Sequence, residues 1–211
     1  MTSCAECGRF ACSGGVKDNW PAGCPMEENG DILEKAREEY LKPEVLQIAQ
    51  NAARVEQEGY CRWTRVEEIM VFARKAGYKK IGLAFCVGLR REAALFNRIL
   101  NDNGFETVSV ACKTGSVPKE FLGLTEEEKL KPGQFEAMCH PVAQAELLNE
   151  QNTDLNVILG LCVGHDTLFI RYAKAPVTVL AVKDRVLAHN PLGALYARHY
   201  FQRRYCIERK P

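Results

Sequence analysis

Hydrophobic residues in the early part of the chain recur at helical spacing. Residues 31–42 and 44–58 are rich in Ala, Leu, Glu, Lys and Arg, which favour helices. A third helix is expected after Thr64, because Thr64 and Glu67 have the spacing of a capping box and Gly77 is an end signal. These segments are predicted to be packing helices with charged faces toward solvent.

From Lys80 onwards the pattern changes to short apolar runs separated by helical stretches. Such runs are typical of strands that are buried on both faces. Strands joined by helices indicate a parallel sheet with right-handed crossovers. The sequence therefore predicts an α/β fold with a mainly parallel Rossmann-like sheet and flanking helices. The predicted strands are 81–87, 106–112, 155–163 and 176–182, and the helices between and after them are 90–104, 141–152, 166–174 and one beginning at Pro191.

Several stretches of this region resemble one another and favour an internal duplication. GLAFCVGLRREAALF and ILGLCVGHDTLFIRY each run from a strand through Cys-Val-Gly into a helix. Farther on, SVACKTG matches VLAVKDR, which aligns Lys113 with Lys183, and residues 139–142 match residues 189–192. Three matches in the same order are better explained by duplication than by chance.

Ten cysteines in 211 residues change this picture. Four of them lie in a Gly- and Pro-rich N-terminal stretch that has neither helical nor strand periodicity. A two-residue spacer lets two thiolates reach one metal ion, and ligation would supply the folding energy that the stretch lacks. We therefore expect residues 1–30 to form a cysteine-rich metal-binding segment and residues 31–211 to form the α/β domain with its leading helices. The predicted metal ligands are Cys4, Cys7, Cys12 and Cys24.

The spacing of these four cysteines favours an iron–sulfur cluster, in particular 4Fe–4S, with zinc as the alternative. Structural zinc sites usually pair two knuckles, whereas only Cys4 and Cys7 form a knuckle here. Single cysteines, with Pro25 following Cys24, fit iron–sulfur ligation better. The run also resembles the four-cysteine cluster segment of nickel carbon monoxide dehydrogenases, over about twenty residues.

A second group of candidate ligands stands at predicted strand ends. Cys86 and Cys162 each end a strand at the start of a helix, where the helix dipole lowers a thiol pKa. In open α/β sheets, ligands bind beyond the carboxyl ends of the strands. We therefore expect a site there that binds a cofactor or metal, or that presents reactive thiols. Its predicted members are Cys86, Cys112, Cys139, Cys162 and His189, with His140, His165 and Asp166 near them in sequence.

Charge and composition exclude several classes of partner. The 28 Lys and Arg residues against 27 Asp and Glu residues give a net charge of +1. This balance does not indicate a protein that binds nucleic acid or anionic lipid. No apolar run approaches the roughly 18 residues that span a bilayer, and the cysteine-rich start has no signal-peptide region. Neither a GxGxxG fingerprint nor a Walker A loop is present. We expect a cytoplasmic protein that acts with a redox partner protein or a small polar ligand.

Four stretches of the chain resemble one family. CAECGRFAC, CHPVAQAELLN, TDLNVILGLCVGHDTLF and APVTVLAVKDRVLAHNPLGALY are similar to a cysteine-rich bacterial and archaeal metal-binding family of unknown function, domain-of-unknown-function family 1847. GLCVGHD and KDRVLAHNP are the most specific of these segments. The resemblance implies metal binding, and it names no substrate or reaction.

Two functional hypotheses follow from a metal site. The first is an iron–sulfur redox protein whose N-terminal cluster relays electrons to the strand-end site. In that case Lys113, Lys183 and Arg185 would attract a small anionic or polar substrate. The second is a zinc-stabilised binding, carrier or sensor protein for a metal ion or a sulfur species, without catalysis. Whether the protein is an enzyme is left open by the sequence.

A third hypothesis needs no redox metal. An α/β enzyme could use Cys162 or Cys86 as its nucleophile beside His165 or His140, although no nucleophile elbow or known cysteine–histidine signature is present. The remaining cysteines, which we expect to be structural, are Cys61 and Cys206.

Overall fold

The computed structural model describes residues 4–15, 20–201 and 204–205 of the chain. It divides into two compact units, Met1–Arg62 and Trp63–Pro211. Cys206, one of the two cysteines expected to be structural, lies outside the described residues.

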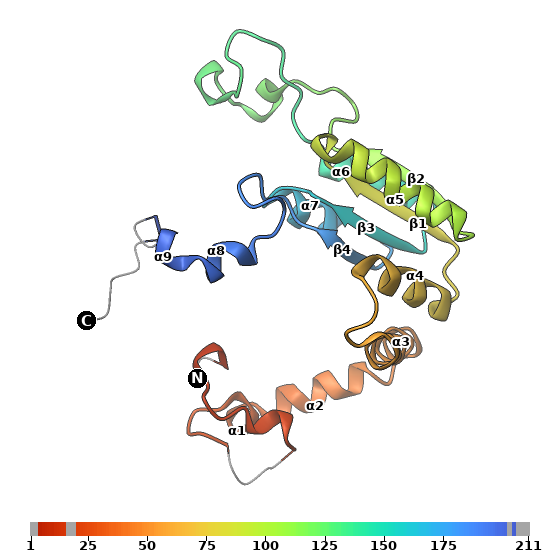
Figure 1. Cartoon of the computed structure of the whole chain (residues 1–211), viewed down its shortest axis with the longest axis vertical. Helices are drawn as coiled ribbons and strands as arrows, with labels where there is room; N and C mark the ends of the chain where they lie inside the picture. Colours follow the sequence, from red (N-terminus) through yellow and green to blue (C-terminus); the bar gives the residue numbers. More distant parts are fainter. Residues whose placement is uncertain (1–3, 16–19, 202–203, 206–211) are drawn as a thin grey trace. The chain divides into compact units, whose positions relative to one another are not determined.

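The first unit consists of short helical elements (Figure 1). Two 3-10 helices, Cys4–Glu6 and Ala11–Ser13, precede α1 (Pro25–Glu28), α2 (Gly30–Glu39) and α3 (Pro43–Gly59). The two helices that the sequence predicts here are confirmed as α2 and α3. No residue of the four elements before α3 is buried. These described elements of the cysteine-rich segment and its neighbourhood therefore form no hydrophobic core of their own.

The second unit is built on a four-stranded parallel sheet (Figure 1). β1 (Lys80–Phe85), β2 (Glu106–Ala111), β3 (Leu155–Leu159) and β4 (Val177–Ala181) lie in the order β2-β1-β3-β4. The central strands β1 and β3 are buried along nearly their whole length, which is why their sequences are almost uninterrupted apolar runs. The predicted α/β fold with a mainly parallel, Rossmann-like sheet is confirmed.

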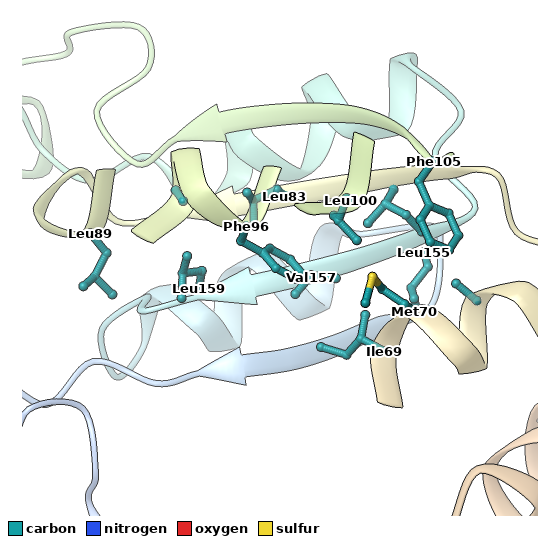
Figure 2. Packing of buried hydrophobic residues seen from close by; sticks show 13 residues of the cluster. Ile69, Met70, Leu83, Leu89, Phe96, Leu100, Phe105, Leu155, Val157 and Leu159 are labelled. Carbon is teal, nitrogen blue, oxygen red and sulfur yellow. The ribbon is translucent and has the colours of Figure 1, made fainter. Parts of the chain in front are cut away.

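Helices cover both faces of this sheet. α4 (Arg65–Ala76) and α5 (Arg90–Asp102) pack on one face, where Leu83, Phe96 and Val157 belong to a common core cluster (Figure 2). α6 (Pro141–Glu150) and α7 (His165–Tyr172) cover the other face, where Leu148 and Phe169 are fully buried. Burial of each such side chain stabilises the fold by about 1.5–3 kcal/mol.

The boundaries of α4 follow the signals that the sequence predicts. The Glu67 N–H donates to Thr64 Oγ1 at 3.4 Å, and the Thr64 N–H donates to the Glu67 carboxylate at 2.7 Å, so both halves of the capping box form. Gly77 ends the helix with a φ of 75°, a left-handed conformation that favours glycine.

The strand order places a switch point between β1 and β3. From β1 the chain passes to β2 on one side, and it later returns to β3 and β4 on the other side of β1. Ligands of open α/β sheets bind in the crevice beyond the carboxyl ends of the strands at such a point. Cys86 directly follows β1 and Cys112 directly follows β2, so both lie at this edge.

The two Cys-Val-Gly segments lie at different heights on that edge. The pairing of β1 with β3 ends with Phe85 opposite Leu159, so Cys86 is level with Gly160 and Cys162 comes two residues later. The predicted strand 155–163 ends at Leu159 because Gly160, with a φ of 70°, turns the chain.

The internal duplication stays a prediction. The matched stretches correspond to the two strand–helix–strand units, β1–α5–β2 and β3–α7–β4.

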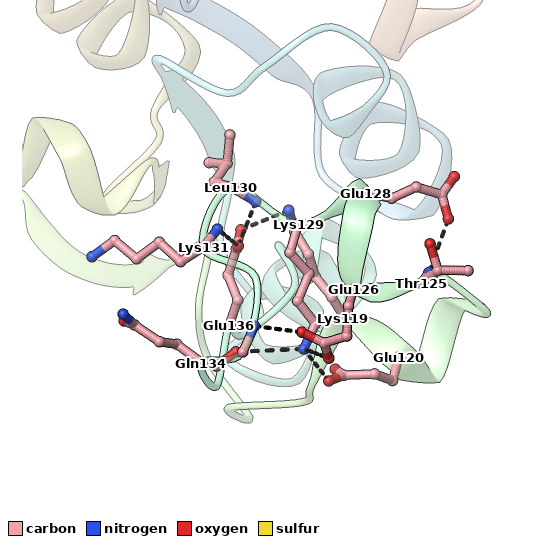
Figure 3. Close-up of polar contacts among 11 residues, drawn as sticks. Lys119, Glu120, Thr125, Glu126, Glu128, Lys129, Leu130, Lys131, Gln134 and Glu136 are labelled. Atoms are coloured by element: carbon pink, nitrogen blue, oxygen red, sulfur yellow. Dashed lines mark hydrogen bonds and ion pairs between the residues drawn. The ribbon is translucent and has the colours of Figure 1, made fainter.

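Residues 113–138, which we call the 113–138 excursion, form an ordered projection between β2 and α6 (Figure 3). Lys129 is only 7% exposed, and its ammonium donates to the carboxylates of Glu120 and Glu126 and to the Gln134 carbonyl oxygen. The Lys129 ammonium thus links three separate positions of the 113–138 excursion.

After β4 the chain continues into two short helices, α8 (Leu192–Tyr196) and α9 (Arg198–Phe201). The predicted helix start at Pro191 is one residue early, since Pro191 is the residue before α8. Among the described residues, no helix combines the length and the apolar character that crossing a membrane requires.

Candidate functional site

Cys86 and Cys112 are neighbours at the carboxyl ends of β1 and β2. The pairing of these strands ends with Phe85 opposite Ala111, so the next residue on each strand is the cysteine. The Cys112 N–H donates to the Phe85 carbonyl at 2.9 Å and extends the ladder by one step. Both side chains join the core cluster on the face covered by α6 and α7. Cys86 is 8% exposed and Cys112 is 2% exposed.

The base of the 113–138 excursion brings Cys139 back to Cys112. The His140 N–H donates to the Cys112 carbonyl at 2.7 Å, and the Lys113 ammonium donates to the Ala137 carbonyl across the same neck. Cys139 also packs against the buried cluster that contains Cys86 and Cys112. Cys112 therefore interacts with both Cys86 and Cys139.

Gln144 fixes the start of α6 to the sheet. Its side chain is fully buried, and its Nε2 donates to the Val110 carbonyl at 2.7 Å and to the Phe85 carbonyl at 3.2 Å. Phe85 directly precedes Cys86, and Val110 lies two residues before Cys112. Because Gln144 lies in the first turns of α6, its two hydrogen bonds hold the start of the helix, and with it Cys139, at the sheet edge. Its Oε1 is buried without a partner among the described residues.

Cys139 pairs with His165, the first residue of α7. Hydrogen bonds from Cys112 and from His165 lower the pKa of Cys139 to about 4, against the opposing effect of burial. The same contact raises the pKa of His165. A thiolate beside a protonated imidazole is the arrangement of an activated cysteine nucleophile.

Cys86 is stabilised as a thiolate from another direction. The Cys112 thiol, the Gly88 N–H and the Lys183 ammonium lower the pKa of Cys86 to about 5. Cys112 behaves in the opposite way, because Cys139, Cys86 and burial all raise its pKa. The single thiol proton of Cys112 can donate a hydrogen bond to only one neighbouring thiolate at a time. In this row of three cysteines, Cys112 favours its protonated form, whereas Cys86 and Cys139 favour the thiolate.

Cys162 lies near this row but has a different partner. The Arg185 guanidinium Nη2 lies 3.2 Å from Cys162 Sγ, and this contact raises the pKa of Arg185. The same guanidinium interacts electrostatically with Cys86 and Cys139. Arg185 therefore contacts Cys162 and also acts through its charge on Cys86 and Cys139.

Two of the candidate histidines are engaged in backbone turns. His140 Nδ1 accepts from the Ala143 N–H at 3.0 Å and caps α6. His189 Nδ1 accepts from the Asp184 N–H at 3.0 Å, in a turn where His189 itself has a φ of 65°. These bonds fix the rings through Nδ1 and leave Nε2 for other contacts. The membership of His189 in the strand-end site stays a prediction.

The four N-terminal cysteines occupy the loop-rich part of the first unit. Cys4 and Cys12 are exposed, and Cys7 and Cys24 are half-buried. The Cys7 N–H donates to the Cys4 carbonyl at 3.2 Å, and backbone N–H groups of Phe10 and Arg9 lower the pKa of Cys7. Cys61 is exposed and has a φ of 56°, a left-handed conformation.

Across the described residues, no three His, Cys, Asp or Glu side chains are grouped so that they could hold a metal ion. The N-terminal cysteines have sulfur donors suited to iron or zinc, but they too are not gathered. The predicted ligand sets therefore stay predictions.

A pocket in this unit lies away from the thiols at the carboxyl ends of the strands. That pocket, of about 520 Å³, lies between α5 and β2 and is lined by side chains such as Arg90, Asn97 and Ser109. It contains no thiol and lies on the α5 face. The perturbed titratable groups, and with them the chemistry, are at the strand ends.

The sequence model of a family described as "Protein of unknown function (DUF1847)" matches residues 24–180. The chain belongs to this family. The match contains Cys86, Cys112, Cys139 and Cys162, whereas Cys4, Cys7 and Cys12 precede it. The chain is also 46% identical over 200 residues to an uncharacterized protein of Methanocaldococcus jannaschii, covering 95% of this chain and 96% of that protein. The DUF1847 description assigns no activity, so function has to be argued from the site.

The cysteine–histidine pair of this DUF1847 member differs from the predicted pairs. The sequence suggests His165 or His140 beside Cys162 or Cys86, whereas His165 contacts Cys139 and His140 caps α6. The signal for the observed pair is weak. Cys139 and His165 both stand at helix starts, and the two helices cover the same face of the sheet.

Proposed function

We propose that this protein has a redox-type function based on its strand-end thiols, with Cys139 as the attacking thiolate and Cys112 as the second thiol of a dithiol pair. The single observation that carries this proposal is the approach of Cys139 to Cys112, since Cys139 packs against the cluster that contains Cys112 and the adjacent His140 N–H donates to the Cys112 carbonyl at 2.7 Å. An accessible thiolate of low pKa beside a buried thiol of raised pKa is the combination that thiol–disulfide exchange requires.

The proposed chemistry is a two-electron exchange with a sulfur electrophile. The Cys139 thiolate attacks a disulfide R–S–S–R′, forms Cys139–S–S–R and releases R′S⁻. Cys112 then loses its proton and attacks the Cys139 sulfur, which gives a Cys112–Cys139 disulfide and RSH. The two protein thiols are oxidised and the substrate disulfide is reduced to two thiols.

The accessibility of the sulfurs supports this order of events. Cys139 is half-buried, whereas Cys112 is 2% exposed and Cys86 is 8% exposed. A reagent therefore meets Cys139 first, and Cys112 follows within the protein. Cys86 stands on the other side of Cys112, where Lys183 holds it as a thiolate.

The test uses a neutral disulfide, bis(2-hydroxyethyl) disulfide, and the reduced full-length protein. We expect two molecules of mercaptoethanol per protein and a Cys112–Cys139 link, identified by peptide mass spectrometry. Cys112→Ser should stop at a mixed disulfide on Cys139, and Cys61→Ser, the matched control, should behave as wild type. A Cys86–Cys112 link would overturn the assignment of Cys139, and the absence of any internal link would overturn the proposal.

A metal-dependent role of the N-terminal segment is a second candidate function. Its supporting observation is that the elements before α3 bury no residue, so a cluster held by Cys4, Cys7, Cys12 and Cys24 would supply the missing folding energy. The donor set suits 4Fe–4S, with zinc as the alternative, and its gathering would have to accompany ligation. The protein would then be an iron–sulfur redox protein, or a zinc-stabilised binding, carrier or sensor protein.

Anaerobic purification followed by iron, zinc and acid-labile sulfide analysis tests this second function. Iron and sulfide in equal amounts, lost in Cys7→Ala and retained in Cys61→Ala, would support the iron–sulfur assignment. Zinc alone would support the alternative. Metal-free protein from cells grown with both metals would sink both assignments and leave the dithiol proposal untouched.

The cellular setting and partners are proposed on the same chemistry. All nine described cysteines are free thiols, the state expected in a reducing compartment, which supports the cytoplasm. A dithiol that is oxidised in each turnover also needs a reductant. We therefore propose a redox partner protein or a small thiol as the second participant.

A further inference from the structure

Three cationic side chains surround the strand-end thiols. Arg185 is exposed and lies 3.2 Å from Cys162 Sγ, and its charge also acts on Cys86 and Cys139. Lys183 donates a hydrogen bond to Cys86, and the Lys113 charge acts on Cys139. Positive charge thus acts on Cys86, Cys139 and Cys162.

The Lys183 ammonium lies close to the backbone of two glycines at the strand ends. A Cβ on Gly88 or on Gly160 would lie 3.6 Å from Lys183 Nζ in each case, and the one on Gly88 would also lie 3.7 Å from Cys86 Sγ. The ammonium therefore lies against bare backbone beside a sulfur. On the Gly160 side the Leu89 side chain fills the remaining space, since a Cβ there would overlap Leu89 Cδ1.

No carboxylate neutralises these cations within the described residues. The ion pairs found there involve other lysines and arginines. The nearest acids in sequence serve their own turns, since Asp184 Oδ1 accepts from the Val186 and Leu187 N–H groups and Asp166 Oδ1 accepts from the Thr167 N–H. The cations therefore face the thiols and the solvent.

From this arrangement we infer that the electrophile of the thiol site is a small oxyanion that carries a sulfane sulfur, with thiosulfate as its simplest member, held by Arg185 and Lys183. The inference rests on the proposed thiol function. A thiolate would repel an anionic substrate unless fixed cations offset the repulsion. The planar fork of Arg185 matches an oxyanion, and the soft sulfur is the atom that a thiolate attacks.

The inferred reaction balances without a further oxidant. The Cys139 thiolate bonds to the terminal sulfur of thiosulfate, and the sulfur–sulfur bond breaks so that sulfite leaves with the electron pair. The product is a Cys139 persulfide, Cys139–S–S⁻. Cys112 then attacks the Cys139 sulfur and gives its proton to the departing terminal sulfur, which leaves as HS⁻ and produces the Cys112–Cys139 disulfide.

The experiment mixes the reduced full-length protein with thiosulfate, without added reductant, and measures sulfite and the mass of the protein. We expect about one sulfite per protein, and in Cys112→Ser a persulfide on Cys139 that adds the mass of one sulfur. Arg185→Gln and Lys183→Gln should each slow sulfite release by about tenfold, since each loses one charge-assisted contact. Arg171→Gln, an exposed arginine at the far end of α7, is the matched control.

A neutral reagent separates the two proposals. At about pH 8 iodoacetamide should alkylate Cys139 at similar rates in wild type, Arg185→Gln and Lys183→Gln, because it carries no charge for the cations to hold. If wild type exchanges with the neutral disulfide but releases no sulfite, the anion inference fails and the thiol function stands. If the two variants release sulfite as fast as Arg171→Gln does, the assignment of Arg185 and Lys183 is wrong. If the wild-type protein reacts with neither the neutral disulfide nor thiosulfate, the thiol function itself fails.

Discussion

Cys139 and His165 interact across the starts of two helices that cover the same face of the sheet. Cys139 stands just before the cap of α6, and His165 is the first residue of α7. The pairing stabilises the thiolate and the imidazolium together, because each charge lowers the electrostatic cost of the other. One residue from each of two crossover connections thus forms the centre of the candidate site.

Replacing His165 should make Cys139 less reactive in acid. In His165→Asn the imidazolium is lost, so the pKa of Cys139 should rise, and its alkylation by iodoacetamide at about pH 5 should slow by roughly tenfold. At about pH 9 the rates should converge, because the thiolate is then fully formed in both proteins. Equal rates at the lower pH would mean that His165 does not set the reactivity of Cys139.

Gln144→Met tests whether the buried amide positions Cys139. The change keeps the volume of the side chain but removes its two hydrogen bonds to the strand-end carbonyls. We expect a loss of about 1–3 kcal/mol in the free energy of unfolding, measured in urea. Formation of the Cys112–Cys139 disulfide should also slow. Leu147→Met, which changes a half-exposed residue on the same helix, is the control and should leave the disulfide rate unchanged.

The positions of the strands along the chain, and the helices between them, were predictable because the strand residues are buried on both faces of the sheet. The runs that contain β1 and β3 are almost continuously apolar, and their central residues are fully buried. The end of β3 was less predictable. The apolar residues continue past Leu159, and only the left-handed conformation of Gly160 ends the strand.

The candidate site was predicted in its location and only partly in its pairings. The strand pattern predicts that Cys86 and Cys112 stand at strand ends, and the register of β1 and β2 makes them neighbours. The approach of Cys139 depends on the 113–138 excursion closing on itself through backbone hydrogen bonds, which leave no periodic signal in the sequence. The pairing of Cys139 with His165 depends in addition on how α6 and α7 pack, which local patterns do not specify.

Lys129→Met tests what orders the 113–138 excursion. Lys129 is buried and satisfied by two carboxylates and a carbonyl oxygen, so its loss leaves Glu120 and Glu126 without their shared cation. We expect faster amide hydrogen exchange in residues 119–136, with exchange in β1 and β3 unchanged. Lys131→Met is the matched control, because Lys131 contributes its backbone N–H to Glu136 and its side chain is exposed. Equal exchange in the two variants would contradict this role.

The thiols also predict how stability depends on pH. The pKa values of Cys86 and Cys139 are lowered on folding to about 5 and about 4, from about 8.5 for a free thiol. Their contribution is therefore fully present above about pH 8.5 and is lost as the pH falls toward 5 and 4. His165 opposes this trend, since its raised pKa contributes stability that is lost as the pH rises through its folded value. Cys112, with a raised pKa, costs stability above about pH 8.5.

The balance of these effects predicts a maximum of stability near about pH 8, because two thiolates outweigh one imidazolium between about pH 5 and pH 8. Urea unfolding midpoints measured across this range should rise with pH in wild type. The rise should be smaller in Cys86→Ser and in Cys139→Ser, since each removes one of the two thiolates. Cys61→Ser should keep the wild-type profile. A midpoint that is flat or falls from about pH 5 to about pH 8 in wild type would show that these thiols are not ionised in the folded protein.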